Sequence, residues 1–181
     1  MTKTPDPEAA ALKLLLRQPL KGPYALCFFD YRHILTDGKA ILDTMTAYEA
    51  RCGESLPFRP DGLTLRLGEQ ALILYNDLID NRGRVNFTIA HELGHVYLNH
   101  EEETPRSQRE ADRFAAALLM PEAVIRFLDC QGGRLLTPAE MTTYFGASLA
   151  ACRRRRTELD SRKPAPLTPD GVELVRRLFE T

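Results

Sequence analysis

The chain has 181 residues, a formal net charge of -1 at pH 7 and 44% hydrophobic residues. This length suits one domain with a modest appendage, and the near-neutral charge gives no general attraction to nucleic acid or membranes. No apolar run reaches the roughly 18 residues of a membrane span, and the first residues lack the pattern of a secretion signal. We therefore expect a cytoplasmic globular protein.

The four cysteines are scattered along the chain and form no C-x-x-C pair. In a reducing cytoplasm such cysteines are usually small buried hydrophobic residues, and a disulfide framework is not expected. They are Cys27, Cys52, Cys130 and Cys152.

The first half of the chain predicts two helices and a small patch of strand. Apolar residues at helical spacing predict helices over about 7–17 and 39–51, and the aromatic-rich segment 24–31 predicts a short strand. Segment 63–67 alternates Leu-Thr-Leu-Arg-Leu, and 71–75 is more continuously apolar, so the two predict a β-hairpin. We expect the strand 71–75 to lie at the sheet edge, where an extended peptide could bind by strand addition.

The second half of the chain predicts helices alone. Three are expected in succession, followed by a helix–turn–helix outline, a proline-rich linker and a short amphipathic helix. The three helices cover about 84–99, 107–120 and 121–130. The helix–turn–helix outline covers 137–148 and 149–159, the linker 163–169, and the amphipathic helix 171–180.

The sequence His91-Glu92-Leu93-Gly94-His95 lies inside one of these helices. Residues four apart share one helical face, so both imidazoles can bind one zinc ion, while Glu92 lies beside the metal and can act as the base. The alternative is a charged helix surface with two ordinary histidines. Apolar and small residues flank the motif, which favours a buried helix whose polar groups need a compensating partner such as a metal.

Glu110 is the candidate for the third metal ligand, because it heads an otherwise apolar helical face. The small Gly94 would let the two helices approach closely. A solvated glutamate in a first helical turn is the alternative. Asp112 could accept a hydrogen bond from a ligand imidazole or lie at the surface. His100 falls about half a turn from the motif and is not expected to bind the same ion; His33 is interpreted as a loop or core histidine.

Two segments together resemble the ImmA/IrrE family of metallo-endopeptidases. They are Phe87-Thr-Ile-Ala-His-Glu-Leu-Gly-His95 and Arg109-Glu-Ala-Asp-Arg-Phe-Ala-Ala-Ala-Leu-Leu-Met-Pro121. The resemblance implies a zincin-like core, with His91, His95 and Glu110 as ligands of one Zn²⁺ per chain and Glu92 as the catalytic base. It also implies a protein partner, often a helix-turn-helix repressor that the enzyme cleaves or inactivates.

The C-terminal helix pair carries Arg153-Arg154-Arg155-Arg156, which raises the question of DNA binding. Four consecutive arginines cannot all face one groove, and the chain is slightly acidic, so direct nucleic-acid binding is not expected. Packing on the core or docking of a partner protein is favoured. Tyr48, Tyr75, Tyr97 and Tyr144 remain open as groups that could stabilise the oxyanion.

We predict an α+β fold: a mostly helical zincin-like core with a small β-sheet on the active-site helix, plus C-terminal helices. The predicted divisions are 1–36, an N-terminal extension packed on the core; 37–130, the metallopeptidase core; and 131–181, a C-terminal helical region. The predicted function is that of a zinc endopeptidase acting on a regulatory protein. The alternatives are a metal-stabilised module that binds a repressor or toxin without cutting it, and a DNA-binding regulator with a vestigial enzyme core.

Overall fold

The computed structural model describes residues 5–163 and 166–180. Within these, the chain forms two compact units. The first contains the described residues up to Ala10 together with Asp30–Ala115; the second contains Ala11–Phe29 and the described residues from Ala116 onward. The chain passes from one unit to the other within helix α1, between Phe29 and Asp30, and within helix α5. The three-part domain division stays a prediction.

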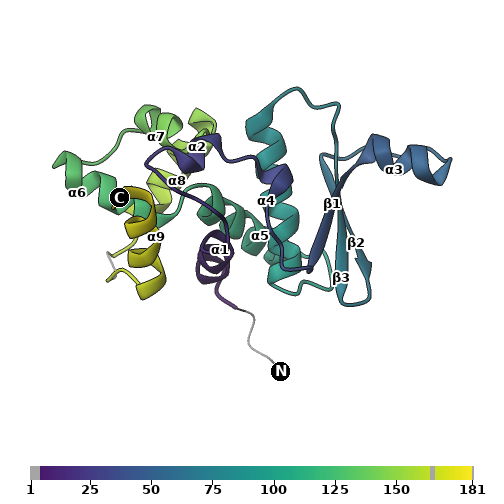
Figure 1. Cartoon of the computed structure of the whole chain (residues 1–181), viewed down its shortest axis with the longest axis horizontal. Helices are drawn as coiled ribbons and strands as arrows, with labels where there is room; N and C mark the ends of the chain where they lie inside the picture. The colour runs from purple at the N-terminus through teal and green to yellow at the C-terminus, as the bar shows by residue number, and fades with distance from the viewer. Residues whose placement is uncertain (1–4, 164–165, 181) are drawn as a thin grey trace. The chain divides into compact units, whose positions relative to one another are not determined.

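The first unit is built on a three-stranded mixed sheet with strand order β1-β3-β2 (Figure 1). The strands are β1 (Ala40–Thr44), β2 (Gly62–Leu67) and β3 (Gln70–Tyr75). β2 and β3 form the predicted antiparallel hairpin, and β1 pairs in parallel with β3. The side chains of Ile73 and Leu74 point to opposite faces of the sheet and are both fully buried, and β3 is the central strand. The expectation that 71–75 lies at the sheet edge is therefore wrong.

The helices of this unit include the one that carries the H-E-x-x-H motif. They are α3 (Met45–Cys52), α4 (Arg82–Tyr97) and α5 (Pro105–Leu119), with a 3₁₀ turn at Tyr31–His33. Asn81 caps α4 by accepting a hydrogen bond from the Arg84 amide. The predicted helix over 39–51 is wrong in its first part, where β1 forms, and helix begins only at Met45.

α4 and α5 approach closely at Gly94, as expected from its size. A Cβ atom at Gly94 would lie 2.9 Å from the Cα of Ala111, so only glycine fits without a shift of one helix. Three residues farther along α5, Phe114 stacks on Tyr97 with ring centroids 6.0 Å apart. Asp112 of α5 is thereby held against His91 of α4.

The second unit consists of helices. They are α2 (Ala25–Phe28), α6 (Glu122–Gly132), α7 (Pro138–Phe145), α8 (Leu149–Asp160) and α9 (Pro169–Phe179), with part of α1 (Pro7–Leu15). The predicted strand over 24–31 is wrong, because α2 and the 3₁₀ turn occupy it. Gly146 ends α7 in the left-handed conformation before α8, as the predicted helix–turn–helix requires. Pro164 and Ala165, in the predicted linker, lie outside the described residues.

Two of the four consecutive arginines bind groups of their own unit. Arg155 is 1% exposed and donates to the carbonyl oxygen of Met120, and Arg156 forms an ion pair with Asp129 at 2.8 Å. Arg153 and Arg154 are exposed. Half of this cationic run is therefore used in packing α8.

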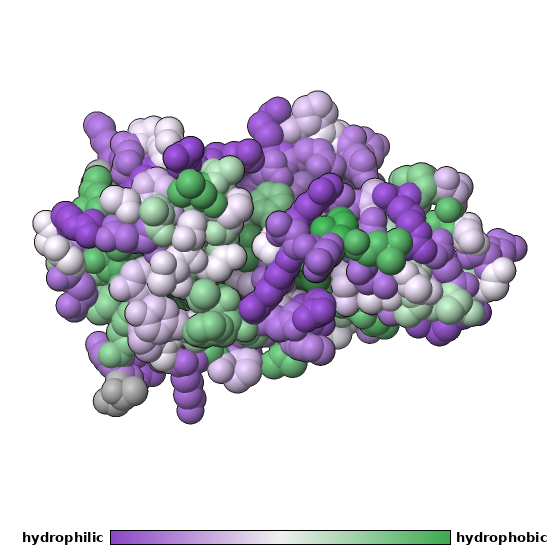
Figure 2. All heavy atoms as spheres, turned by 90° about the horizontal axis from the view of Figure 1, so that it is seen from above, coloured by the Kyte–Doolittle hydropathy of each residue, from purple (hydrophilic) through white to green (hydrophobic). Residues whose placement is uncertain are grey.

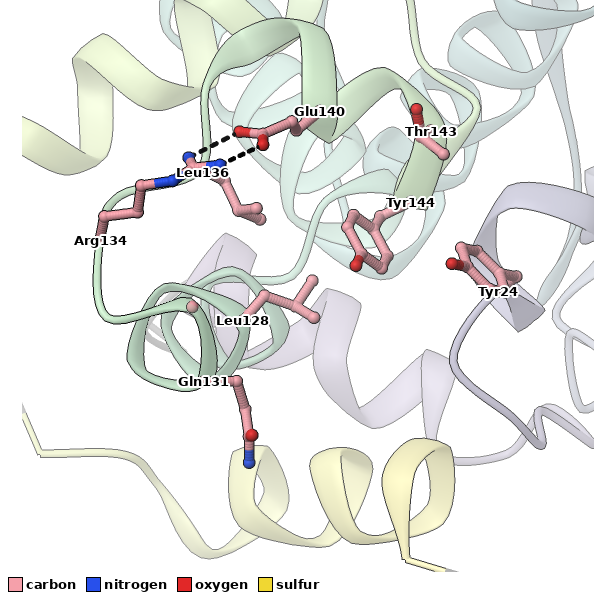
Figure 3. A pocket seen from close by; sticks show the side chains of 9 residues that line it. Tyr24, Leu128, Gln131, Arg134, Leu136, Glu140, Thr143 and Tyr144 are labelled. Carbon is pink, nitrogen blue, oxygen red and sulfur yellow. Dashed lines mark hydrogen bonds and ion pairs between the residues drawn. The ribbon is translucent and has the colours of Figure 1, made fainter.

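A pocket of about 420 Å³ lies in the second unit (Figure 3). Tyr24 and Tyr144 stack at its side with ring centroids 5.4 Å apart, and Arg134 pairs with Glu140 through both carboxylate oxygens.

Hydrophobic residues on the face drawn in Figure 2 lie in small groups among hydrophilic ones. None of the helices in the described ranges is long and apolar enough to cross a membrane.

The cysteines are all free thiols. Cys152 is buried, Cys27 is partly buried, and Cys52 and Cys130 are exposed. The expectation of small buried residues therefore describes Cys152 alone.

Candidate active site

Helix α4 directs the imidazoles of His91 and His95 toward each other. Their Nε2 atoms are 3.1 Å apart, and the ring centroids 4.9 Å apart. Two nitrogens bound to one tetrahedral zinc ion at 2.0–2.1 Å lie roughly 3.3 Å apart. The helical spacing of the motif has therefore produced the separation that a shared metal ion requires.

The other ring nitrogens of this pair point to polar partners. Nδ1 of His91 is 2.9 Å from Oδ1 of Asp112. Nδ1 of His95 is 3.1 Å from Nδ1 of His100, whose Nε2 is 3.1 Å from Oε2 of Glu110. Asp112 thus contacts an imidazole of the motif, although half of its side chain is exposed. His100, which was not expected to bind the metal ion, contacts both His95 and Glu110.

One assignment of protons satisfies all three outer contacts. His91 donates from Nδ1 to Asp112, His95 donates from Nδ1 to His100, and His100 donates from Nε2 to Glu110. This assignment leaves a lone pair on each of the two Nε2 atoms that face each other at 3.1 Å. Two such lone pairs repel unless a cation lies between them, so the donor set fits a metal.

The local electrostatics favour a neutral His95, which a metal ligand must be. Burial, followed by the positive charges of His91 and His100, lowers the pKa of His95 to about 4. Burial also pulls the pKa of His91 down, but the hydrogen bond and negative charge of Asp112 and the charge of Glu92 together raise it above its usual value. The two ligand candidates therefore have unequal affinities for protons.

Glu92 lies next to the sheet. Its Oε2 accepts a hydrogen bond from the hydroxyl of Thr64 on β2 at 2.5 Å. Burial raises the pKa of Glu92, and this Thr64 hydrogen bond and the neighbouring His91 oppose the rise. A partly buried carboxylate with a raised pKa, beside two candidate metal ligands, is suited to accept and return a proton.

Glu110 faces the site from α5 but has other partners. Its Oε1 accepts from Arg106 at 2.8 Å and its Oε2 contacts His100. The Arg106 hydrogen bond is the main cause that lowers the pKa of Glu110. Over the described ranges, no three or more His, Cys, Asp or Glu side chains are arranged to hold one metal ion. The role of Glu110 as third ligand stays a prediction.

Other candidates lie outside this cluster. His33 is on the exposed 3₁₀ turn, with 82% of its side chain exposed. The hydroxyl of Tyr97 donates to the carbonyl oxygen of Thr36. Sequence reasoning missed Thr64 and Arg66, two inward-facing residues of β2; Arg66 donates to the carbonyl oxygens of His95 and His100 at 3.1 Å each. Successive residues of a strand point to opposite faces of the sheet, and this alternation along β2 could have identified Thr64 and Arg66.

A helix that carries the H-E-x-x-H motif and packs against a small sheet is typical of metallopeptidases. The family model described as Peptidase_M78, the IrrE N-terminal-like domain, matches residues 55–157. The chain belongs to this family, which is a family of metallopeptidases. The match contains β2, β3, α4 and α5, and so every residue of the cluster. No curated protein was found to match the chain.

Proposed function

We propose that the protein is a zinc-dependent endopeptidase, with His91, His95 and Glu110 as the metal ligands and Glu92 as the catalytic base. The observation that carries the proposal is the pair of Nε2 atoms of His91 and His95, which converge at 3.1 Å while their Nδ1 atoms bind other groups.

Glu110 would become the third ligand by giving up its contacts with Arg106 and His100. That arginine is 75% exposed and pairs with Glu110 across one helical turn. Exposed pairs of this kind contribute little to stability, so the Arg106 contact is weak beside the affinity of a carboxylate for zinc. Zinc is favoured over Mg²⁺ or Ca²⁺ because two of the ligands are imidazoles.

In the proposed reaction, Glu92 accepts a proton from the attacking water and passes it to the leaving amine. Bound zinc would lower the pKa of water to about 7 and polarise the scissile carbonyl. Asp112 and His100 hold the two imidazoles in the tautomer that directs Nε2 inward.

An extended peptide would bind along the free edge of β2. The amide of Asn76 donates to the carbonyl oxygen of Asp61, and β2 continues from this bond in antiparallel register. Because hydrogen-bonded and non-hydrogen-bonded pairs alternate, the backbone groups of Gly62, Thr64 and Arg66 point away from β3. These groups are able to pair with a substrate strand beside Glu92.

The proposed substrate is a regulatory protein of the cytoplasm, a helix-turn-helix repressor, and this part of the proposal rests on the family resemblance. The alternative is a module that binds such a partner without cleaving it. Glu92 favours cleavage, because a metal that only stabilises the fold has no use for a base beside it.

The test is Glu92→Gln, which keeps the shape of the side chain and leaves the metal ligands in place. Since general acid–base assistance is worth about 10²–10⁴-fold, the zinc-loaded variant should cleave a partner repressor at least about a hundred times more slowly. Zinc content, measured by elemental analysis, should match that of the wild type. Cleavage by Glu92→Gln at the wild-type rate would refute the mechanism, and binding without cleavage by the wild type would favour the alternative.

A further inference from the structure

The inner face of β2 contacts Glu92 at two alternate residues. The hydroxyl of Thr64 donates to Oε2 of Glu92 at 2.5 Å. At Gly62 an added Cβ would lie 3.0 Å from Cγ of Glu92 and 2.5 Å from Cγ2 of Thr88. The missing side chain at Gly62 therefore lets the strand approach α4 until the Thr64 hydroxyl reaches the carboxylate.

We propose that Thr64 is a positioning residue that fixes the orientation of the Glu92 carboxylate. This inference rests on the proposed function of Glu92 as a base. Oε2 is held by Thr64, whereas Oε1 has no hydrogen-bond partner among the described residues, so Oε1 is the oxygen left to accept a proton. Glutamate has three rotatable side-chain bonds, and a hydrogen bond to one oxygen removes alternative orientations that would point the other away from substrate.

Thr64 is suited to this role because its side chain and backbone have different tasks. The side chain points to α4, on the same face of the sheet as its register partner Ile73. The backbone groups point to the free edge, where we place the substrate. A change of the hydroxyl alone should therefore affect the proton-transfer step and leave peptide binding intact.

The experiment compares Thr64→Val with Thr64→Ser. Valine keeps the β-branched shape that suits a strand but removes the hydroxyl, and serine keeps the hydroxyl. Because hydrogen bonds to charged groups are among the stronger ones, Thr64→Val should lower kcat about tenfold or more. KM and zinc affinity should not change, and Thr64→Ser should restore most of kcat. In the Glu92→Gln background, Thr64→Val should have no further effect on the residual rate.

Thr36→Val is the matched control. Thr36 is buried and donates its hydroxyl to the carbonyl oxygen of Ala40 at 2.6 Å, so the same substitution removes one hydrogen bond elsewhere in the unit. It should lower stability without lowering kcat. An equal fall of kcat in Thr36→Val, a wild-type kcat in Thr64→Val, or a failure of serine to restore it would each overturn the proposal.

A second measurement does not depend on cleavage. In urea unfolding of the zinc-loaded protein, Thr64→Val and Glu92→Ala should be non-additive, because each removes the same contact. If the wild type cleaves nothing but the two effects are non-additive, the proposed function fails while the contact stands. Additive effects would overturn the role of Thr64 whether or not the protein is a peptidase.

Discussion

Substitution of Gly94 by alanine should separate α4 from α5. The new Cβ would lie 2.9 Å from Cα, 3.2 Å from Cβ and 3.2 Å from the carbonyl oxygen of Ala111. Carbon atoms pack favourably at about 3.5–4.0 Å, so the helices must move apart by roughly 0.5–1 Å. Overpacking costs about 1–3 kcal/mol, and the higher helix propensity of alanine returns about 1 kcal/mol. We expect a net loss of about 1 kcal/mol, and of at most about 2 kcal/mol.

The same displacement should weaken zinc binding at the proposed site. Asp112 follows Ala111 directly, and its contact with His91 is 2.9 Å long, so a shift of α5 would stretch it. Urea unfolding measures the stability, and competition with a chelator measures the zinc affinity. Gly132→Ala is the control, because a Cβ at Gly132 meets nothing within 4 Å and should be neutral or slightly stabilising. A Gly94→Ala protein as stable as the wild type would refute the reasoning.

Two further predictions concern zinc binding by His91 and His95 and the effect of Glu140, in α7, on stability. A chelator should lower the melting temperature of the wild type, but not that of a His91→Ala, His95→Ala double variant, which should retain no stoichiometric zinc by elemental analysis. Hydrogen bonds from Arg134, and then from Thr137, lower the pKa of Glu140 to about 2, so its stabilising effect is present above about pH 4.5 and is lost as the pH falls through 2. Glu140→Gln should therefore destabilise the protein to urea at pH 6, and the difference from wild type should vanish near pH 2; a difference independent of pH would contradict this origin.

The elements that the sequence predicted correctly are those whose signal is local. α4, α5 and the β2–β3 hairpin follow from helical spacing and strand alternation over a few residues. β1 does not, because Ala40–Thr44 becomes a strand by pairing in parallel with β3, about thirty residues later in the chain. That pairing also makes β3 the central strand and leaves β2 as the edge strand nearest the motif. A parallel strand pair is not joined by a tight turn, so no turn sequence next to β1 predicts the pairing.

His100 shows why the candidate site was predicted only in part. Its placement away from the motif assumed that the helix continues beyond residue 97, but α4 ends at Tyr97 and Asn99 adopts a left-handed conformation with φ of 55°. Asparagine tolerates that conformation better than most residues. The chain therefore turns back, and the His100 amide donates to the carbonyl oxygen of His95. The Nδ1 atoms of the two imidazoles lie 3.1 Å apart.

The same reversal determines which group Glu110 meets. A helical wheel predicts the direction of this carboxylate from α5, but it contains no information about a residue that lies beyond the end of α4. His100 occupies the space between His95 and Glu110 and contacts both. Spacing along one helix therefore predicted that His91 and His95 share a face, and their Nε2 atoms lie 3.1 Å apart. The surroundings of Glu110, the proposed third ligand, depend on the loop that joins the two helices, and a single glycine, Gly94, sets how closely those helices pack.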